Sequence, residues 1–347
     1  MNLIMNMDEF YTSKKKDKST VEFTITIPRK IFTETYQNLL KENTKKADVK
    51  GFRKGKVPAD LVESEISQSL RLETFEKLIP LYLSTALQKE NISPVAPPDY
   101  KDFPKLEGEE DITFTVEITV MPEFKLGNLK KIKIEKEKVE VPAKEINEAL
   151  ENIFKNNESK FKEMNDDWAK ETGKLIGNEK ITNMEELKKY VEDTLKSQKE
   201  HMLKHKQEDS ALEQAIKLSE IVIPEPAIKY EALEREHSFE HDMQQRSIKI
   251  EDFLKANNIT LEKMRELWLK DAKQALETDV FLRTYAKDRN LQFSDEDLAK
   301  KIEDIKKQAP EGTDKSIFDN EDWKEYIRRV SLKDLAFKKF SEEVISK

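Results

Sequence analysis

The four histidines of this 347-residue chain fall into two pairs, His201/His205 and His237/His241. Each pair is spaced i,i+4, which places both rings on one side of a helix. Two such pairs could complete a tetrahedral zinc site. Neighbouring carboxylates that could add oxygen ligands are Glu200, Glu236 and Glu240. The favoured alternative is that both pairs belong to polar helix faces that happen to use histidine, so the sequence predicts no metal and no other cofactor.

A second group of chemically capable residues is the basic stretch Gly51-Phe52-Arg53-Lys54-Gly55-Lys56-Val57-Pro58. Glycines on both sides of Phe52-Arg53-Lys54 let the chain turn tightly. The stretch is therefore predicted to be a protruding tip that shows one aromatic ring and several cations. An aromatic ring beside arginine is typical of a docking hot spot, and the cations suit RNA phosphates or acidic side chains. Folding of the Phe52 ring back into the core is the open alternative.

Nucleotide binding and catalysis are not indicated. A P-loop has four residues between its glycines and then Lys-Ser/Thr, whereas three residues separate Gly51 from Gly55, and Val57 follows Lys56. Motifs of serine hydrolases, zinc proteases and dinucleotide-binding proteins are absent from the sequence. A chain without cysteine has no disulfide or thiolate chemistry. No catalytic residue is predicted.

Composition favours long helices with solvated faces. Charged residues make up 38% of the chain and hydrophobic residues 37%, and the apolar residues are periodic, which argues against disorder. The net charge is −8, yet residues 1–60 hold 13 Lys/Arg against eight Asp/Glu. A basic loop on an acidic chain favours contact with an anionic surface, a merely solvated loop being the alternative. With no signal-peptide or membrane-span pattern, a cytoplasmic protein without a membrane partner is expected.

The N-terminal part carries the pattern of a sheet with one buried face. Apolar and polar residues alternate in two segments far apart in the sequence, which predicts two strands. Helical spacing occurs between them, and Pro58 suits the first position of the second helix. Residues 1–121 are therefore predicted to form a small α+β domain. The predicted elements are strands 21–27 and 112–120, with helices around 31–40 and 61–70.

The rest of the chain is predicted to be mainly α-helical. Residues 122–160 should be an extended connector followed by a helix from Pro142, and residues 161–347 a helical domain. Thr182 and Glu185 make a capping box, from which a helix should run to about Ser219 with a weak apolar stripe interrupted in its middle. Further helices are predicted at 226–246, 260–289, 295–308 (begun by Ser294) and 320–345, with Gly173 and Gly177 in a loop.

The basic stretch resembles the ribosome-binding signature of the bacterial trigger factor family, Gly-Phe-Arg-x-Gly-Lys-x-Pro, and every fixed position matches. The resemblance continues in order along most of the chain. The matching segments are Val21–Ile27, Ile112–Pro122, Asn165–Leu175 and Ile221–Pro226. The resemblance assigns ribosome contact to Phe52, Arg53 and Lys54, and Lys56 is a further candidate ribosome-binding residue. It gives Gly51, Gly55 and Pro58 the role of shaping the loop.

The resemblance implies an ATP-independent chaperone that docks on the large ribosomal subunit near the exit tunnel, touching ribosomal protein and rRNA. There it would hold unfolded nascent polypeptides between long helical arms, and it leaves open a homodimer of the free protein. Family members usually carry a glycine-rich peptidyl-prolyl isomerase domain after the connector. Only a few residues separate the connector helix from Met164 here, so this domain is expected to be missing and the protein is expected not to be an enzyme.

Most apolar residues of the helical part must be ordinary core. Methionine adapts to varied partners, so some of these side chains are better candidates for lining a client surface. The candidates are Met202, Met243, Met264, Phe239 and Trp268. The rival functions are a helical adaptor, a holdase free of the ribosome, or an exported chaperone. The first two functions would leave the basic tip without a role, and the third would require a signal peptide, which the sequence does not show.

Overall fold

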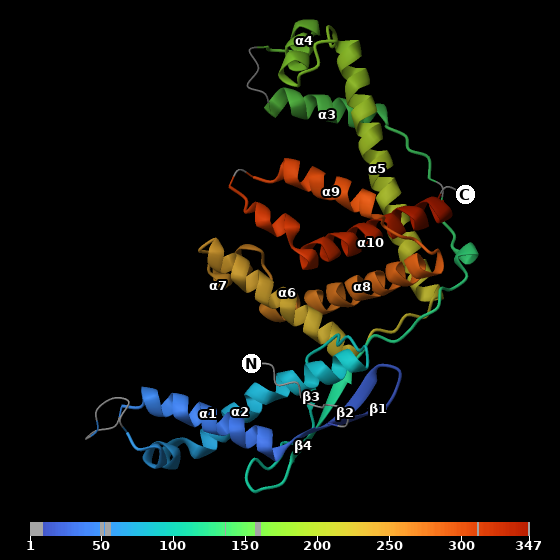
Figure 1. Cartoon of the computed structure of the whole chain (residues 1–347). Coiled ribbons are helices and arrows are strands. Elements are labelled where there is room, and N and C mark those ends of the chain that lie inside the picture. The colour runs from blue at the N-terminus through green and yellow to red at the C-terminus, as the bar shows by residue number, and fades with distance from the viewer. Residues whose placement is uncertain are drawn as a thin grey trace. The chain divides into compact units, whose positions relative to one another are not determined.

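The computed structural model describes residues 10–48, 52, 57–135, 137–156, 161–310 and 312–345, and Figure 1 traces the order of its elements. The chain divides into two compact units, each built from two separate stretches. One unit joins residues 1–124 with 222–277, and the other joins 125–221 with 278–347. The predicted class, a small α+β part followed by a long helical part, is confirmed.

A four-stranded antiparallel sheet lies in the N-terminal part, in the order β1-β2-β4-β3. Its strands are β1 (Tyr11–Lys15), β2 (Thr20–Ile27), β3 (Asp99–Tyr100) and β4 (Ile112–Thr119). Strands β2 and β4 pair along their whole length, with Thr20 opposite Thr119 and Ile27 opposite Ile112. Both predicted strands are confirmed, whereas β1 and β3 were not predicted.

Two helices, α1 (Arg29–Lys46) and α2 (Ala59–Lys89), complete this region and lie side by side (Figure 1). The C-terminal half of α2 packs Phe75, Leu78 and Tyr82 against the buried face of the sheet. That face consists of alternate β2 and β4 residues, as the period-2 pattern requires. Burial raises the pKa of Tyr82 to about 12, so this phenol stays neutral within the core.

The second unit begins with the connector and three helices, α3 (Ala143–Asn156), α4 (Asp166–Leu175) and α5 (Met184–Leu218). The connector is extended, as predicted, apart from one 3-10 turn at Leu129–Lys131. Gly173 lies inside α4, so its predicted place in a loop is wrong. A Cβ at Gly173 would come within 2.8 Å of the Ile181 Cβ, which explains a glycine within a helix.

The predicted capping box at the start of α5 is wrong by one residue. Asn183, not Thr182, caps the helix and accepts from the Glu186 N–H at 3.0 Å. Glu186, not Glu185, reaches back to the Thr182 N–H at 2.7 Å. An asparagine amide oxygen caps at least as well as a threonine hydroxyl. Without a break, the 35 residues of α5 extend for about 53 Å.

The connector is hydrogen-bonded to the C-terminal end of α5 at Gly127. The Gly127 N–H donates to Ser219 Oγ at 2.9 Å, and Ser219 Oγ donates to the Ala215 carbonyl at 2.8 Å. Further along, the Gln214 amide bonds both the N–H and the carbonyl of Lys133, at 3.0 and 2.9 Å. The extended connector therefore lies against α5 through main-chain contacts, which are independent of the connector's side-chain types.

The remaining helices match the predicted ranges within two residues, except that one short helix was not predicted. They are α6 (Glu225–Gln245), α7 (Ile250–Ala256, the unpredicted one), α8 (Leu261–Asp288), α9 (Asp295–Gln308) and α10 (Glu321–Ile345). Ser294 caps α9 as predicted, accepting from the Asp297 N–H at 3.1 Å. Among the residues that the structure describes, no helix combines the length and apolarity needed to cross a bilayer.

An aromatic cluster holds α10 against the C-terminal half of α8. Phe340 and Phe281 are fully buried, with ring centroids 5.0 Å apart, and Tyr285 lies 5.8 Å from Phe340. The Tyr285 hydroxyl donates to Glu343 at 2.8 Å. Burial, followed by this hydrogen bond, raises the pKa of Tyr285 to about 12. The cluster therefore combines apolar packing with one satisfied polar group.

Candidate functional site

The candidate docking tip lies between the C-terminal half of α1 and the N-terminal half of α2. These halves share an apolar cluster that includes Tyr36, Leu39 and Leu40 from α1. Val57 and Val62 join the same cluster from the α2 side, and Val57 is only 4% exposed. Since Pro58 caps α2, Val57 and Val62 occupy the two positions of a hydrophobic staple. The staple fixes the angle at which the chain leaves the tip and enters α2.

Pro58 is one position away from its predicted place. It was expected inside the first turn, but its ψ of 137° is extended and α2 begins at Ala59. The reason is the staple, which needs the chain to turn between Val57 and the helix. The sequence interpretation missed Val57, because it stands at a variable position of the signature. An apolar residue directly before a helix start, with another apolar residue five positions later, is the signal that could have found it.

Within the tip the structure describes Phe52, whose side chain is 42% exposed. The interpretation in which this ring is fully withdrawn into the core is thereby not supported. Gly51, Arg53, Lys54, Gly55 and Lys56 lie outside the described residues. Close to the tip, the last turn of α1 adds exposed Lys45 and Lys46. Cations at a helix C-terminus also interact favourably with the helix dipole.

A partly buried hydrogen bond stiffens the base of the tip. The Tyr36 hydroxyl on α1 donates to the Glu63 carboxylate on α2 at 2.9 Å. Burial is the main cause, and this hydrogen bond the second, of a Tyr36 pKa raised to about 12. The phenol therefore remains a donor at every physiological pH, and the two helices stay tied on the side where the tip emerges.

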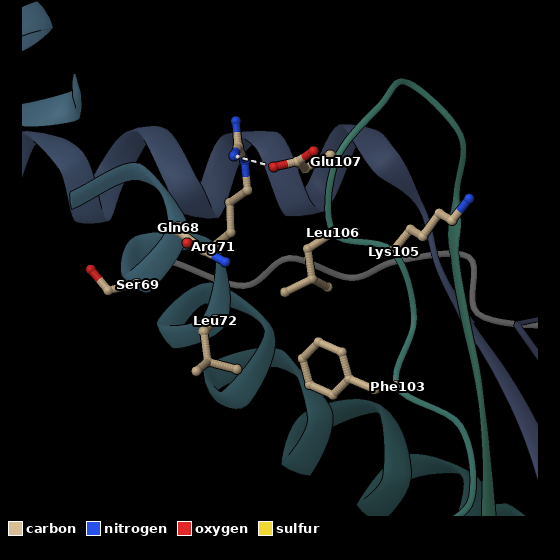
Figure 2. A pocket seen from close by; sticks show the side chains of 8 residues that line it. All are labelled: Gln68, Ser69, Arg71, Leu72, Phe103, Lys105, Leu106 and Glu107. Atoms are coloured by element: carbon tan, nitrogen blue, oxygen red, sulfur yellow. Dashed lines mark hydrogen bonds and ion pairs between the residues drawn. The ribbon is translucent and has the colours of Figure 1, made fainter. Parts of the chain in front are cut away.

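A hollow of about 750 Å³ opens between α2 and the segment that follows β3. Figure 2 shows Leu72, Leu106 and Phe103 facing one another, with the Arg71–Glu107 ion pair beside them. Arg71 Nη1 lies 3.1 Å from Glu107 Oε1. Phe103 is 70% exposed, although its edge contacts the buried Phe75 ring, with centroids 5.6 Å apart. The hollow can accept an apolar side chain beside charged groups of both signs.

The predicted client-lining residues have very different exposures. Met202 on α5 is exposed, Met243 on α6 is buried, and Met264, Phe239 and Trp268 are half-buried. Met243 therefore presents no surface to a client in this conformation.

Phe239 and Trp268 do come together, with ring centroids 5.5 Å apart, and Phe253 of α7 adds a third ring at 5.3 Å from Phe239. Next to these rings lies a small hollow of about 180 Å³ between α6 and α8. The exposed Leu233 and Leu269 line it, together with Arg265 and its ion-pair partner Glu236. Apolar area beside charged groups suits weak contact with varied polypeptides.

The two histidine pairs lie in different compact units of the chain. His201 and His205 lie on α5, and His237 and His241 lie on α6. Across the described ranges, no group of three or more His, Cys, Asp or Glu side chains is placed to hold a metal ion. Within the first pair, however, the two Nε2 atoms are 3.3 Å apart. In the second pair, His241 Nε2 instead contacts Gln245 Nε2 at 2.9 Å.

Comparison with known proteins gives a consistent family. A family model described as "Bacterial trigger factor protein (TF)" matches residues 10–153. A second, "Bacterial trigger factor protein (TF) C-terminus", matches residues 183–341. Together they cover most of the chain. The two models are those of the N-terminal and C-terminal parts of the family, and residues 154–182 lie between them.

Individual relatives agree. The trigger factor of Staphylococcus epidermidis is 22% identical over 392 residues, covering 86% of this chain and 89% of the relative. That of Bacillus cytotoxicus is 24% identical over 375 residues, covering 81% and 86%. Both alignments are longer than this 347-residue chain, so each relative contains residues that have no counterpart here.

One solved structure extends the likeness to the fold. It comes from work on promiscuous substrate recognition in folding and assembly by the trigger factor chaperone. Its TM-score is 0.54 at 16% identity, covering 96% of this chain and 99% of that one. With two family models matched in order and an α+β region followed by long helices, the chain belongs to the trigger factor family.

Proposed function

We propose that this protein is an ATP-independent chaperone that docks on the large ribosomal subunit through Gly51–Pro58 and holds nascent polypeptides. The observation that carries the proposal is the complete signature on the α1/α2 pair, whose base is fixed by the Val57 staple and the Tyr36–Glu63 bond. A rigid base lowers the entropic cost of binding. An exposed ring among cations supplies both apolar contact and attraction to RNA phosphate.

Co-sedimentation with vacant bacterial ribosomes tests the docking. The wild type is expected to pellet with ribosomes, and Phe52→Ala/Arg53→Ala/Lys54→Ala is expected to bind at least about ten-fold more weakly, since one hot-spot truncation alone costs about 2 kcal/mol. Binding of the wild type should also weaken with salt, because phosphate contacts release counterions.

The matched control is Phe103→Ala/Lys105→Ala, which removes an exposed ring and a cation from another place in the same unit. This control should pellet like the wild type. Equal pelleting of wild type and triple variant would show that the tip is not the anchor, and a helical adaptor or a free holdase would then describe the protein better. Circular dichroism of each variant separates lost docking from lost folding.

Client holding is proposed to use apolar surface exposed among charges. The exposed Met202, the α6/α8 hollow with Leu233, Trp268 and Leu269, and the hollow beside Phe103 have this character. Such surfaces need no hydrolysable cofactor, which is why ATP independence is part of the proposal. The functional division is proposed to follow residues 1–121 for docking, 122–160 as connector and 161–347 for clients, in a cytoplasmic protein that can form a homodimer off the ribosome.

We further propose that the protein has no peptidyl-prolyl isomerase activity. The family models leave residues 154–182 between them, and part of that stretch is α4, which leaves no room for a separate sheet domain. A protease-coupled assay on a proline peptide should give only the uncatalysed rate, with relaxation over tens to hundreds of seconds. Turnover that rises with protein concentration would overturn this proposal.

A further inference from the structure

We propose that His201 and His205 form a two-imidazole site on α5 for a divalent transition-metal ion. Neither the resemblance nor ribosome docking gives this pair a role. The site lies in the middle of α5, between Leu195 and Gln207, where no described side chain is buried. A bound ion would bridge one turn of the helix there.

The first argument is the separation of the two nitrogens. Nε2 of His201 and Nε2 of His205 are 3.3 Å apart. With both nitrogens about 2.0–2.1 Å from one ion, this separation corresponds to an N–metal–N angle of about 105–110°. That angle is close to the tetrahedral one, so the separation of the two nitrogens already suits one shared ion.

The second argument is the carboxylate behind His205. Nδ1 of His205 lies 3.2 Å from Oε2 of Glu208, whose side chain is only 8% exposed. Glu208 is itself held, because its Oε1 accepts from Ser341 Oγ on α10 at 3.0 Å. A carboxylate at this distance favours the tautomer with its proton on Nδ1, and in that tautomer Nε2 carries the lone pair that a metal ion needs. A carboxylate is one of the partners, with backbone carbonyls and water, that commonly orient metal-bound histidines.

The ligand class follows from the donors. Imidazole nitrogen suits Zn²⁺, Cu²⁺ and Ni²⁺, whereas Mg²⁺ and Ca²⁺ prefer oxygen. Among the first three ions, the near-tetrahedral angle favours Zn²⁺. Since no third protein ligand gathers there within the described residues, water completes the coordination. Such a site binds reversibly, more weakly than a structural zinc site of four protein ligands.

The other histidine pair provides a contrast within the same chain. His237 and His241 have the same spacing, yet His241 Nε2 is engaged by Gln245 at 2.9 Å. His237 Nδ1 is 3.8 Å from Glu234, too far for a hydrogen bond. In this part of the described chain no contact joins the two rings, and no buried carboxylate orients them. The inference therefore applies to the α5 pair alone.

Titration calorimetry of the full, untagged chain with Zn²⁺ at neutral pH tests the site, because Zn²⁺ prefers the tetrahedral angle. We expect one ion per chain, and a loss of at least about ten-fold in affinity in both His201→Ala and His205→Ala. Glu208→Gln should weaken binding by about ten-fold or more. The double variant His237→Ala/His241→Ala should bind like the wild type, and Mg²⁺ should give no heat of binding.

Three results would overturn the proposal. They are no Zn²⁺ binding by the wild type, unchanged affinity in either single variant on α5, or loss of binding in the α6 double variant. Because His205 is more than half exposed, its replacement should leave the fold intact, which circular dichroism checks. If Glu208→Gln unfolds, Ser341→Ala keeps the carboxylate and removes only its anchor, and should weaken binding by a smaller factor.

Discussion

Gly127→Ala is expected to destabilise the protein by about 3 kcal/mol, at the upper end of what overpacking costs. A Cβ at this position would overlap the carbonyl group of Leu218 and lie 2.8 Å from the Ser219 nitrogen. These are main-chain atoms at the end of α5, so they can yield only if the helix end or the connector shifts. A shift would also break the bond from the Gly127 N–H to Ser219 Oγ. Urea unfolding followed by circular dichroism measures the loss.

Gly108→Ala is the matched control. Gly108 has a φ of +95°, but no atom lies within 4 Å of the Cβ that alanine would add. Its replacement meets backbone strain alone, which costs about 1–2 kcal/mol. If Gly127→Ala unfolds at the same urea concentration as Gly108→Ala, the connector is not held tightly against α5.

Phe340→Ala is expected to cost about 3–5 kcal/mol, the range for removing a fully buried phenylalanine. The substitution deletes the ring that contacts both Phe281 and Tyr285, so the packing between α8 and α10 loses its centre. Loss of the ring should also expose the Tyr285 phenol to water. The Tyr285 pKa would then fall from about 12 towards its ordinary value, because burial is the main cause of the shift.

Chemical unfolding measures the stability change, and an ultraviolet titration of tyrosine measures the pKa. Phe337→Ala is the control, since Phe337 is one turn earlier on α10 and only half-buried. We expect it to cost less than half as much as Phe340→Ala and to leave the tyrosine titration unchanged. Equal losses for both variants would contradict the central position of Phe340.

The sequence predicted the elements whose stability is local or whose burial follows a simple period. Strand β2 alternates without error from Val21 to Ile27, and Ser294 marks the start of α9. Strand β1, by contrast, reads Tyr-Thr-Ser-Lys-Lys and is mostly exposed. It is a strand because it pairs with the edge of β2, and its own residues do not show the alternating apolar pattern that predicts a strand. The short helix α7 likewise has no buried residue.

The candidate site shows the same limit. The residue types that could dock were evident in the sequence, but their support was not. Val57 was taken for a variable residue, although its burial against Tyr36 orients the tip. The two histidine pairs looked equivalent by spacing. What distinguishes them is Glu208, whose carboxylate accepts a hydrogen bond from Ser341, 133 residues away.

The pairing of β2 with β4 has a consequence for the synthesis of this protein. Ile27 ends β2 and pairs with Ile112, which begins β4. Ile112 follows Ile27 by 85 residues, so at about 5–20 residues per second β2 leaves the ribosome roughly 4–17 seconds before β4 does. During that interval its apolar face lacks the β4 side chains and its inner edge lacks hydrogen bonds, a state prone to aggregation. Each newly made copy of this protein would therefore itself be a nascent chain that benefits from a holding factor.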